Sequence, residues 1–413
     1  MSPNVQSTEY ANQEEPEEFV TNVPNDDSQA KQTLNEGTST CSAKTHEESV
    51  ASSSRTSSNV EWSPTPTTVV NGLPNAPWAR RRYEPNLNGI HDEILDFHAW
   101  LKPTAEEIAI RRKIFNQVAD ALSTLFYRSQ IYLFGSVATN LFLPSSDIDI
   151  AIDLGDMDLG CLDKVAKLLR DANNFENINI ISRTSVPIVK LIDSSTLISV
   201  DISFNTQHNL SRCASWINRQ KDFLPELEPI VLILKQFLVQ YGYNEPWNGG
   251  LPSYALVLMV VHIITQYPPP NRRCSLGHIF INFLLFFGIR FDYNEMGLRI
   301  WSGPDKKRCG VISKCELAFI MGIDKCSSIL FIQDPVQPNN NVGKSVHNLM
   351  SIKESFAKAY LTINNAIMCC KTCDKSYIDA YYYGPMISLV VQFSDEEAKK
   401  RYRCINSIRY HYA

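Results

Sequence analysis

The feature that most constrains this chain is a pair of aspartates, one residue apart, at the start of a short apolar segment. Asp147 and Asp149 alternate with Ile148 and Ile150. Because side chains two residues apart on a strand project from the same face, both carboxylates would share one face while the isoleucines enter a core. Two adjacent carboxylates repel each other unless a cation lies between them. The pattern therefore predicts a β-strand that presents a site for a divalent cation.

A glycine-serine turn precedes the pair at a spacing that supports this interpretation. An apolar segment, residues 131–134, is followed by Gly135 and Ser136, and Gly135 lies twelve residues before Asp147. Glycine lets the backbone approach a phosphate closely, and a serine hydroxyl with neighbouring N–H groups can donate to a triphosphate. Hard oxygen ligands suit Mg²⁺, which shares its coordination shell with substrate phosphates. Beside the aspartates, this turn predicts a nucleoside triphosphate site.

A third carboxylate is required where two metals flank an in-line displacement. Asp201 stands in the middle of the apolar segment 198–204. An aspartate at such a position is costly to bury without a partner, so we expect it to face the metals. Asp153, Asp156 and Asp158 compete for the role, but they follow the strand among glycines, and we interpret them as a solvated loop.

The order of strand-like and helical segments predicts the fold class. A helix over residues 105–126 would begin with an acidic first turn, and two strands flank the polar turn 193–195, which is a hairpin signal. The predicted strands are 131–134, 148–154, 186–192 and 197–204, and the predicted helices are 91–100, 105–126, 161–172, 229–241, 253–265, 276–288 and 351–368. The fold class is therefore α+β: a mixed sheet with helices, then a mostly helical domain, with a cleft between them.

Charge and composition change along the chain. The net charge is −5, but residues 1–60 carry ten acidic and three basic side chains, which leaves +2 for the remainder. Residues 1–76 contain few large apolar side chains, so we expect a disordered N-terminal tail. The slightly basic remainder agrees with a local groove that attracts phosphates.

The cysteines and the apolar segments exclude several classes of protein. The eleven cysteines are odd in number and irregularly spaced, and no signal-like segment opens the chain, so we expect reduced thiols. The single pair Cys370 and Cys373 lacks the second pair that a zinc site needs. No segment reaches the roughly eighteen apolar residues of a membrane span, so we expect no membrane association. His262, inside the apolar segment 251–264, is interpreted as a satisfied core histidine.

Three side chains of the helical region are candidate substrate contacts. Lys235 lies within an apolar helix, where it either extends to solvent or binds the triphosphate. Ser253 follows a glycine-rich loop and either caps the next helix or contacts a phosphate. Tyr254 either stacks on a base or packs in the core. The residues by themselves leave these alternatives open.

Together these residues resemble the DNA polymerase β-like nucleotidyltransferase superfamily. More closely, they resemble its noncanonical poly(A) polymerases of the nuclear-exosome type, the catalytic subunits of TRAMP-like complexes. The resemblance covers about residues 77 to 360, and its motifs are 77–83, 91–97, 134–136, 143–149, 200–205, 234–238, 249–256, 331–335 and 341–345. It implies a polymerase-β-like catalytic domain and a helical central domain with a PAP-associated region.

The resemblance also implies a role for each matched residue. Asp147, Asp149 and Asp201 would be the catalytic metal ligands, with Asp201 at the RNA 3′-hydroxyl. The implied nucleotide-binding residues are Gly135, Ser136, Asn205, Asn209, Lys235, Ser253, Tyr254, Asp334 and Asn340. The implied activity is template-independent addition of adenosine from ATP to an RNA 3′ end, with Mg²⁺ or Mn²⁺.

Base choice and departures from the family pattern concern a few positions. Related uridylyltransferases often carry a histidine where this chain has Asn340, which favours ATP over UTP. The departures are Asn140, where glycine is usual; Tyr241, where arginine is usual; and Asn341, where aspartate is usual. They bear on rate and base discrimination. A terminal uridylyltransferase and a catalytically weak scaffold remain the alternative interpretations.

The implied organisation has five parts. These are a tail over residues 1–76, a segment and helix packing on the central domain over 77–117, a catalytic domain over 118–225, a central domain over 226–368 and a C-terminal tail over 369–413. Basic and aromatic residues at 399–403 either bind RNA or form a solvated helix end. The resemblance implies an RNA 3′ end as substrate, a zinc-knuckle RNA-binding protein and an exosome-linked helicase as partners, and the nucleus, with the cytoplasm as alternative location.

Overall fold

The computed structural model describes residues 76–127, 129–153, 160–182, 187–204, 209–270, 275–300, 309–323, 328–372 and 384–412. All of them belong to one compact unit, Ser63–Ala413. Several predictions fall outside the described residues: the tail up to residue 75, Asp156, Asp158, Asn205 and Cys373. Among the described helices, none has the length and the apolar character that crossing a membrane requires.

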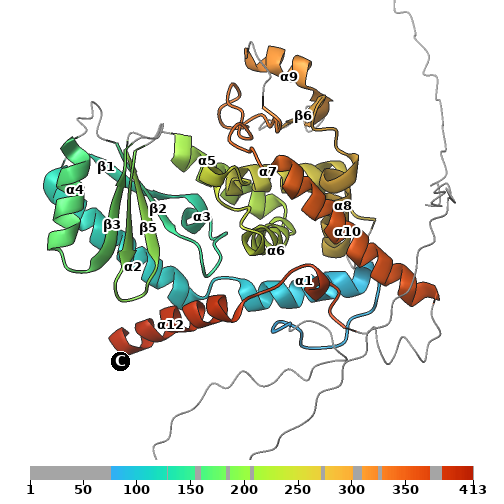
Figure 1. Cartoon of the computed structure of the whole chain (residues 1–413), viewed down its shortest axis with the longest axis horizontal. Coiled ribbons are helices and arrows are strands. Elements are labelled where there is room, and N and C mark those ends of the chain that lie inside the picture. The colour runs from blue at the N-terminus through green and yellow to red at the C-terminus, as the bar shows by residue number, and fades with distance from the viewer. Residues whose placement is uncertain are drawn as a thin grey trace, which may run out of the picture. The chain divides into compact units, whose positions relative to one another are not determined.

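A five-stranded mixed sheet forms between residues 130 and 204 (Figure 1). Its strands are β1 (Gln130–Phe134), β2 (Ile148–Asp153), β3 (Phe175–Ile181), β4 (Ile188–Asp193) and β5 (Ser199–Phe204), in the order β1-β2-β5-β4-β3. Strands β2 and β5 are parallel, and the other neighbours are antiparallel. The predicted hairpin of β4 and β5 is confirmed, whereas the sequence prediction omitted β3, an edge strand with only one buried residue.

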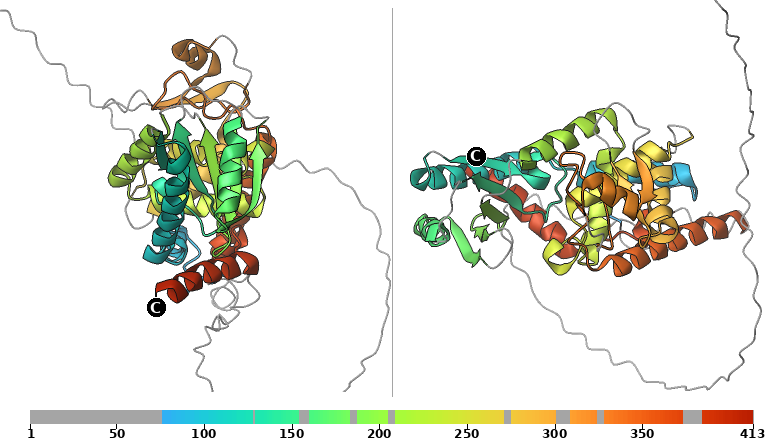
Figure 2. Two further views of the ribbon diagram at one scale, coloured as in Figure 1. Left: turned by 90° about the vertical axis from the view of Figure 1, so that its left-hand side faces the viewer. Right: turned by 90° about the horizontal axis from the view of Figure 1, so that it is seen from above.

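Two helices cover one face of this sheet (Figure 2). They are α2 (Ala105–Leu125), which begins at a capping box formed by Thr104 and Glu107, and α4 (Gly160–Asp171). Their apolar stripes share a core with Ile148 and Ile150, which are fully buried. The isoleucines therefore enter the core as predicted, and the aspartates between them are left for the other face. Helix α2 therefore packs against the sheet along its apolar face.

A second core holds the helical region. Its elements are α1 (Leu87–Leu101), α5 (Asn209–Phe223), α6 (Leu227–Gln240), η1 (Pro246–Asn248), α7 (Ser253–Gln266), α8 (Ser275–Leu285), the π-helical η3 (Phe286–Arg290) and α10 (Leu349–Thr372). A hairpin of β6 (Met296–Arg299) and β7 (Gly310–Ser313) packs with α9 (Lys314–Met321) as a small satellite cluster. The predicted α+β architecture is confirmed, but α5, α9 and the β6–β7 hairpin were not predicted.

His262 corrects one sequence interpretation. It is buried in α7 near the rings of Tyr267, Phe286 and Phe287, and neither ring nitrogen has a hydrogen-bond partner within the described part of the chain. Burial lowers the pKa of His262 to about 4. It is a core histidine, as predicted, but it is not a satisfied one.

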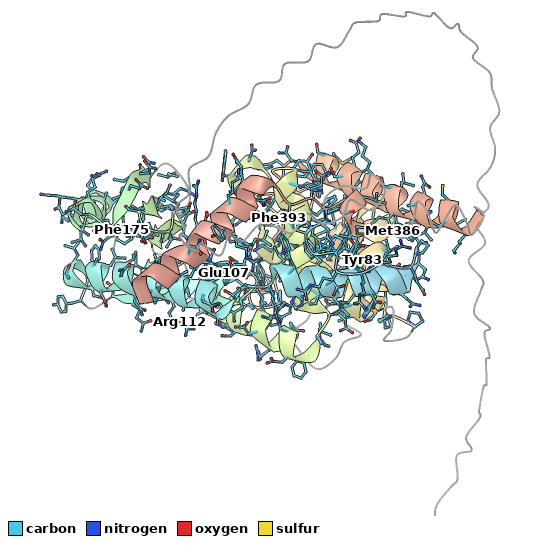
Figure 3. The ribbon with its side chains drawn as sticks, turned by 90° about the horizontal axis from the view of Figure 1, so that it is seen from below. Tyr83, Glu107, Arg112, Phe175, Met386 and Phe393 are labelled. Atoms are coloured by element: carbon cyan, nitrogen blue, oxygen red, sulfur yellow. The ribbon has the colours of Figure 1, made fainter. Side chains whose placement is uncertain are left out.

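The C-terminal segment also corrects the sequence interpretation, because its described part is packed. Residues Ile387–Leu389 form the short helix η5, whose Ile387 is fully buried in the helical core, and α12 (Asp395–Tyr412) follows. Figure 3 shows α12 crossing α2, with Glu107 labelled beside the crossing. There Arg401 donates to both oxygens of the buried Glu107 carboxylate at 3.1 Å. The expected tail is thus a segment that contacts both cores.

Candidate active site

The structure brings the three predicted acids together through strand register. Asp149 on β2 lies opposite Asp201 on the parallel strand β5, and Asp201 lies opposite Lys190 on β4. Since paired residues of neighbouring strands share a face, an aspartate, a second aspartate and a lysine form one row across the sheet. Asp147 directly precedes β2. It is two residues from Asp149 along the chain and so lies next to the Asp149 end of this row.

The electrostatics of the acids reflect their crowding. Burial raises the pKa of Asp149 to about 7, and the charges of Asp201 and Asp147 add to the rise. Burial also raises the pKa of Asp147 to about 6, with Asp201 the next cause and Glu245 a further one. Carboxylates that repel one another in this way hold their charge at neutral pH only beside compensating cations.

Three cations from three different elements approach these acids. Lys190 donates from Nζ to Asp201 Oδ2 at 2.6 Å. Arg111 on α2 and Lys235 on α6 interact with the acids through their charges. The charge of Arg111 lowers the pKa of Asp147, and that of Lys235 lowers the pKa of Asp149. Of the three cations, the sequence interpretation named only Lys235.

The Lys235 side chain does not extend to solvent, and its ammonium group has a hydrogen-bond partner. It is 7% exposed, and its Nζ donates to the carbonyl oxygen of Leu141 at 2.8 Å. Burial lowers the pKa of Lys235 to about 8, although Asp149 and Asp147 act in the opposite direction. Extension to solvent is therefore excluded, and a contact with a triphosphate stays a prediction.

The donor set fits a divalent cation chemically, although the side chains are not closed around one. Within the described ranges, no group of three or more histidine, cysteine, aspartate or glutamate side chains stands ready to hold a metal ion. Asp201 is engaged through Oδ2 with Lys190, while its Oδ1 is buried and has no hydrogen-bond partner in this part of the chain. A buried carboxylate oxygen without a partner is costly. A hard cation beside Asp147 and Asp149 would satisfy it.

Gly135 shapes the space around Asp149. It follows β1 at the start of the short helix α3 (Gly135–Ala138), with a φ of +65°. A Cβ atom on this residue would lie 2.1 Å from Asp149 Oδ2. Only glycine leaves room for that carboxylate, so the glycine-serine turn and the aspartate pair are parts of one site. Ser136, half-buried, follows in α3.

The departure at Asn140 has a backbone explanation. Asn140 is exposed and has a φ of +56°, a left-handed conformation that glycine adopts freely and that asparagine tolerates better than most residues. The backbone therefore accepts asparagine where the family usually has glycine.

The predicted base-recognition residues form a closed hydrogen-bond cluster. Tyr254 donates its hydroxyl to Asp334 Oδ1 at 2.9 Å, and Asn340 donates its amide to Asp334 Oδ2 at 3.0 Å. Asp334 Oδ1 also accepts from the backbone N–H of Val336 and Gln337. Asp334 is 3% exposed, so it organises the loop, and Asn340, which is only half-buried, remains the more accessible of the two.

The remaining predicted residues have simpler outcomes. Ser253 is the first residue of α7, its side chain is exposed, and Pro252 holds the N-cap position without a side-chain cap; the capping alternative is wrong. Asn209 begins α5, but its side chain lies outside the described part.

The departure at Asn341 has a hydrogen-bond explanation. Asn341 accepts from the N–H groups of Ile332 and Gly343 and donates to Leu330 O. The family's usual aspartate could not make that donation.

Comparisons with known proteins agree with this geometry. The model of the central palm domain of mitochondrial-like poly(A) RNA polymerases matches residues 90–213, which include all three acids, and the model of Cid1 family poly A polymerases matches residues 275–340. The solved polymerase core of TRAMP, an RNA surveillance complex, is similar with a TM-score of 0.65 and 26% identity, over 77% of this chain and 100% of that one.

Two curated relatives show how far the similarity extends. Poly(A) RNA polymerase gld-4 of Caenorhabditis elegans is 34% identical over 344 residues, which cover 80% of this chain but only 40% of that protein. The inactive noncanonical poly(A) RNA polymerase protein Trf4-2 of Drosophila melanogaster is 30% identical over 318 residues, which cover 75% of this chain and 74% of that protein. The resemblance seen in the sequence is thereby confirmed, and this chain belongs to the noncanonical poly(A) RNA polymerase family.

Proposed function

We propose that this protein transfers adenylate from ATP to the 3′ end of RNA, with two divalent cations at Asp147, Asp149 and Asp201. The observation that supports this proposal most is the register of Asp149 and Asp201 on adjacent parallel strands. It sets two carboxylates side by side, where Asp147 and the glycine at position 135 complete the site. Bound Mg²⁺ or Mn²⁺ would lower the pKa of the RNA hydroxyl and neutralise the triphosphate.

The protein's own groups orient the reactants. Gly135 and Ser136 would receive the triphosphate through backbone N–H groups and a hydroxyl, and the charge of Lys235, which acts on Asp149, would counter that of the triphosphate. Asp201, which lies between Asp149 and Lys190 in the row, would orient the attacking hydroxyl. Lys190 holds this carboxylate by one oxygen and leaves the other free to do so.

ATP is the preferred nucleotide in this proposal. Asn340 carries an amide, with both donor and acceptor atoms, and Asp334 holds it in place. Tyr254 is tied to the same carboxylate, so its ring is fixed in orientation, as stacking on a base requires. Asn205 and Asn209 would contact the ribose or the base edge.

The proposal extends to partners and location. By the family resemblance, this protein would act beside a zinc-knuckle RNA-binding protein and an exosome-linked helicase, and mark nuclear RNAs for processing or decay. The similar polymerase core of TRAMP belongs to an RNA surveillance complex, which supports action within an assembly. Immunolocalisation and co-purification of the endogenous protein test both points. A cytoplasmic distribution, or purification without a helicase, would contradict them.

The decisive experiment is primer extension with the full chain. A labelled oligoadenylate is incubated with Mg²⁺ or Mn²⁺ and each nucleoside triphosphate separately, and the same assay is run on Asp147→Ala and Asp149→Ala. We expect ATP-dependent extension that either substitution abolishes. Extension with UTP in place of ATP would identify a terminal uridylyltransferase.

The fly relative, which is named as inactive, makes a non-catalytic scaffold a specific alternative. This chain keeps all three acids and the glycine that accommodates one of them, so we expect activity. Absence of extension with all four nucleotides and both metals would establish the scaffold instead.

A further inference from the structure

Arg111 is a buried cation that the family motifs do not include. It lies on α2, which packs against the sheet, and it is 0% exposed. Its guanidinium donates to the carbonyl oxygens of Pro144 at 3.0 Å and Ser146 at 3.4 Å. It also donates to Glu107 O at 3.5 Å. The guanidinium lies 4.3 Å from the ring centre of Phe142, so three carbonyls and an aromatic face surround it.

These contacts complete the hydrogen bonding of the turn that leads into Asp147. Within the turn, the N–H of Ser146 donates to Leu143 O at 2.9 Å, and the N–H of Leu143 donates to the Ser146 hydroxyl at 2.9 Å. The carbonyls of Pro144 and Ser146 are the acceptors that Arg111 takes. The carbonyl of Ser146 belongs to the peptide bond that joins Ser146 to Asp147, so Arg111 fixes the peptide plane directly before the first acid.

From this arrangement we propose that Arg111 is a positioning residue for Asp147. It acts through the backbone of the turn 143–146 and not by contact with a substrate. Nη2 donates to both turn carbonyls while Nη1 donates to Glu107 O, and a lysine ammonium, with a single nitrogen, cannot reproduce this planar pair of donors. The inference rests on the proposed function, because it concerns how well Asp147 is presented to a cation.

The test compares variants of the full chain by three measurements. They are Arg111→Met, which removes the donors; Arg111→Lys, which keeps the charge; and Arg112→Met, a control at the exposed neighbouring position on α2. Thermal unfolding verifies folding, hydrogen–deuterium exchange reports on the turn 143–146, and electron paramagnetic resonance measures Mn²⁺ affinity without nucleotide or RNA.

We expect Arg111→Met to raise the Mn²⁺ dissociation constant by about 10- to 100-fold, as for groups that orient a metal ligand. Exchange at the amide of Ser146 should accelerate in parallel. Arg111→Lys should lie between this variant and the wild type, and Arg112→Met should match the wild type. RNA affinity, measured by fluorescence anisotropy, should change by less than about twofold, because Arg111 would not touch the substrate.

Folded Arg111→Met protein with Mn²⁺ affinity and exchange within twofold of the wild type would overturn the inference. If Arg111→Met does not fold, Arg111→Lys and Phe142→Leu decide. Arg111→Lys keeps the positive charge, and Phe142→Leu keeps an apolar side chain beside it. Unchanged Mn²⁺ affinity in both variants would likewise refute the positioning role. Failure of the proposed function is recognised separately, because the wild-type protein itself would then bind no Mn²⁺ or would extend no RNA.

Discussion

Substitution of Gly135 by alanine tests the geometry of the site most directly. Gly135 has a φ of +65°, and an added Cβ would lie 2.1 Å from Asp149 Oδ2 and 2.9 Å from its Cγ. Two separate penalties follow. The left-handed backbone conformation costs an alanine about 1–2 kcal/mol, and the Asp149 carboxylate must move aside because a Cβ and a carboxylate oxygen cannot approach so closely.

A matched control separates the two penalties. Gly322, at the end of α9, has a φ of +66°, and nothing lies within 4 Å of the Cβ that alanine would add there. Gly322→Ala therefore loses only the free energy of the unfavourable backbone conformation. Both variants should lose about 1–2 kcal/mol of unfolding free energy in urea. Gly135→Ala should lose more where the displaced carboxylate is not accommodated elsewhere.

Activity should distinguish the variants much more strongly than stability does. The carboxylate of Asp149 has to shift by about 1 Å to restore ordinary contact distances, and a misplacement of that size costs about 100-fold in rate. We expect Gly135→Ala to extend a labelled RNA at least about 100-fold more slowly than Gly322→Ala in single-turnover assays. Rates for the two variants within threefold of each other would refute the reasoning that Gly135 exists to accommodate Asp149.

Two further predictions concern stability. Because burial raises the pKa of Asp149 to about 7 in the folded state, proton uptake by this carboxyl stabilises the metal-free protein at low pH, and this stability is lost as the pH rises from about 4 to about 7. In EDTA, Asp149→Asn should therefore melt at a higher temperature than the wild type at pH 8 but not at pH 4; an equal difference at both pH values would contradict this. Arg401→Met breaks a pair with the buried Glu107, so urea unfolding should show a loss of about 3–5 kcal/mol, whereas Arg403→Met, at an exposed position, should change it by less than about 0.5 kcal/mol.

Local patterns in the sequence were sufficient for the elements on which the site is built. Alternation of aspartate and isoleucine predicted a strand with one buried face, and both isoleucines are fully buried. The residues around Thr104 predicted the start of α2, where a capping box forms. These features could be predicted because a strand period of two and a helix cap depend on neighbours only a few residues away.

Other features could not be predicted from the sequence, because their local signals are weak or because their partners lie far along the chain. Strand β3, at the sheet edge, has only one buried residue of seven, so it carries little hydrophobic alternation. The helix α12 is strongly polar, and nothing in its own sequence reveals that Arg401 meets a carboxylate on α2. His262 was expected to be satisfied, but hydrogen-bond partners are a property of the surrounding helices.

The sequence by itself determined which chemical groups this protein has and on which local elements they stand: two carboxylates on strands and a third directly before one, a glycine after a strand, and a lysine within a helix. Only the tertiary structure decided how those groups are used. Strand pairing set Asp201 between Asp149 and Lys190, and packing of α2 brought a buried guanidinium to the turn before Asp147. The physical reason is that side-chain periodicity is encoded locally, whereas the register between strands and the packing of helices depend on contacts between segments that are distant in the chain.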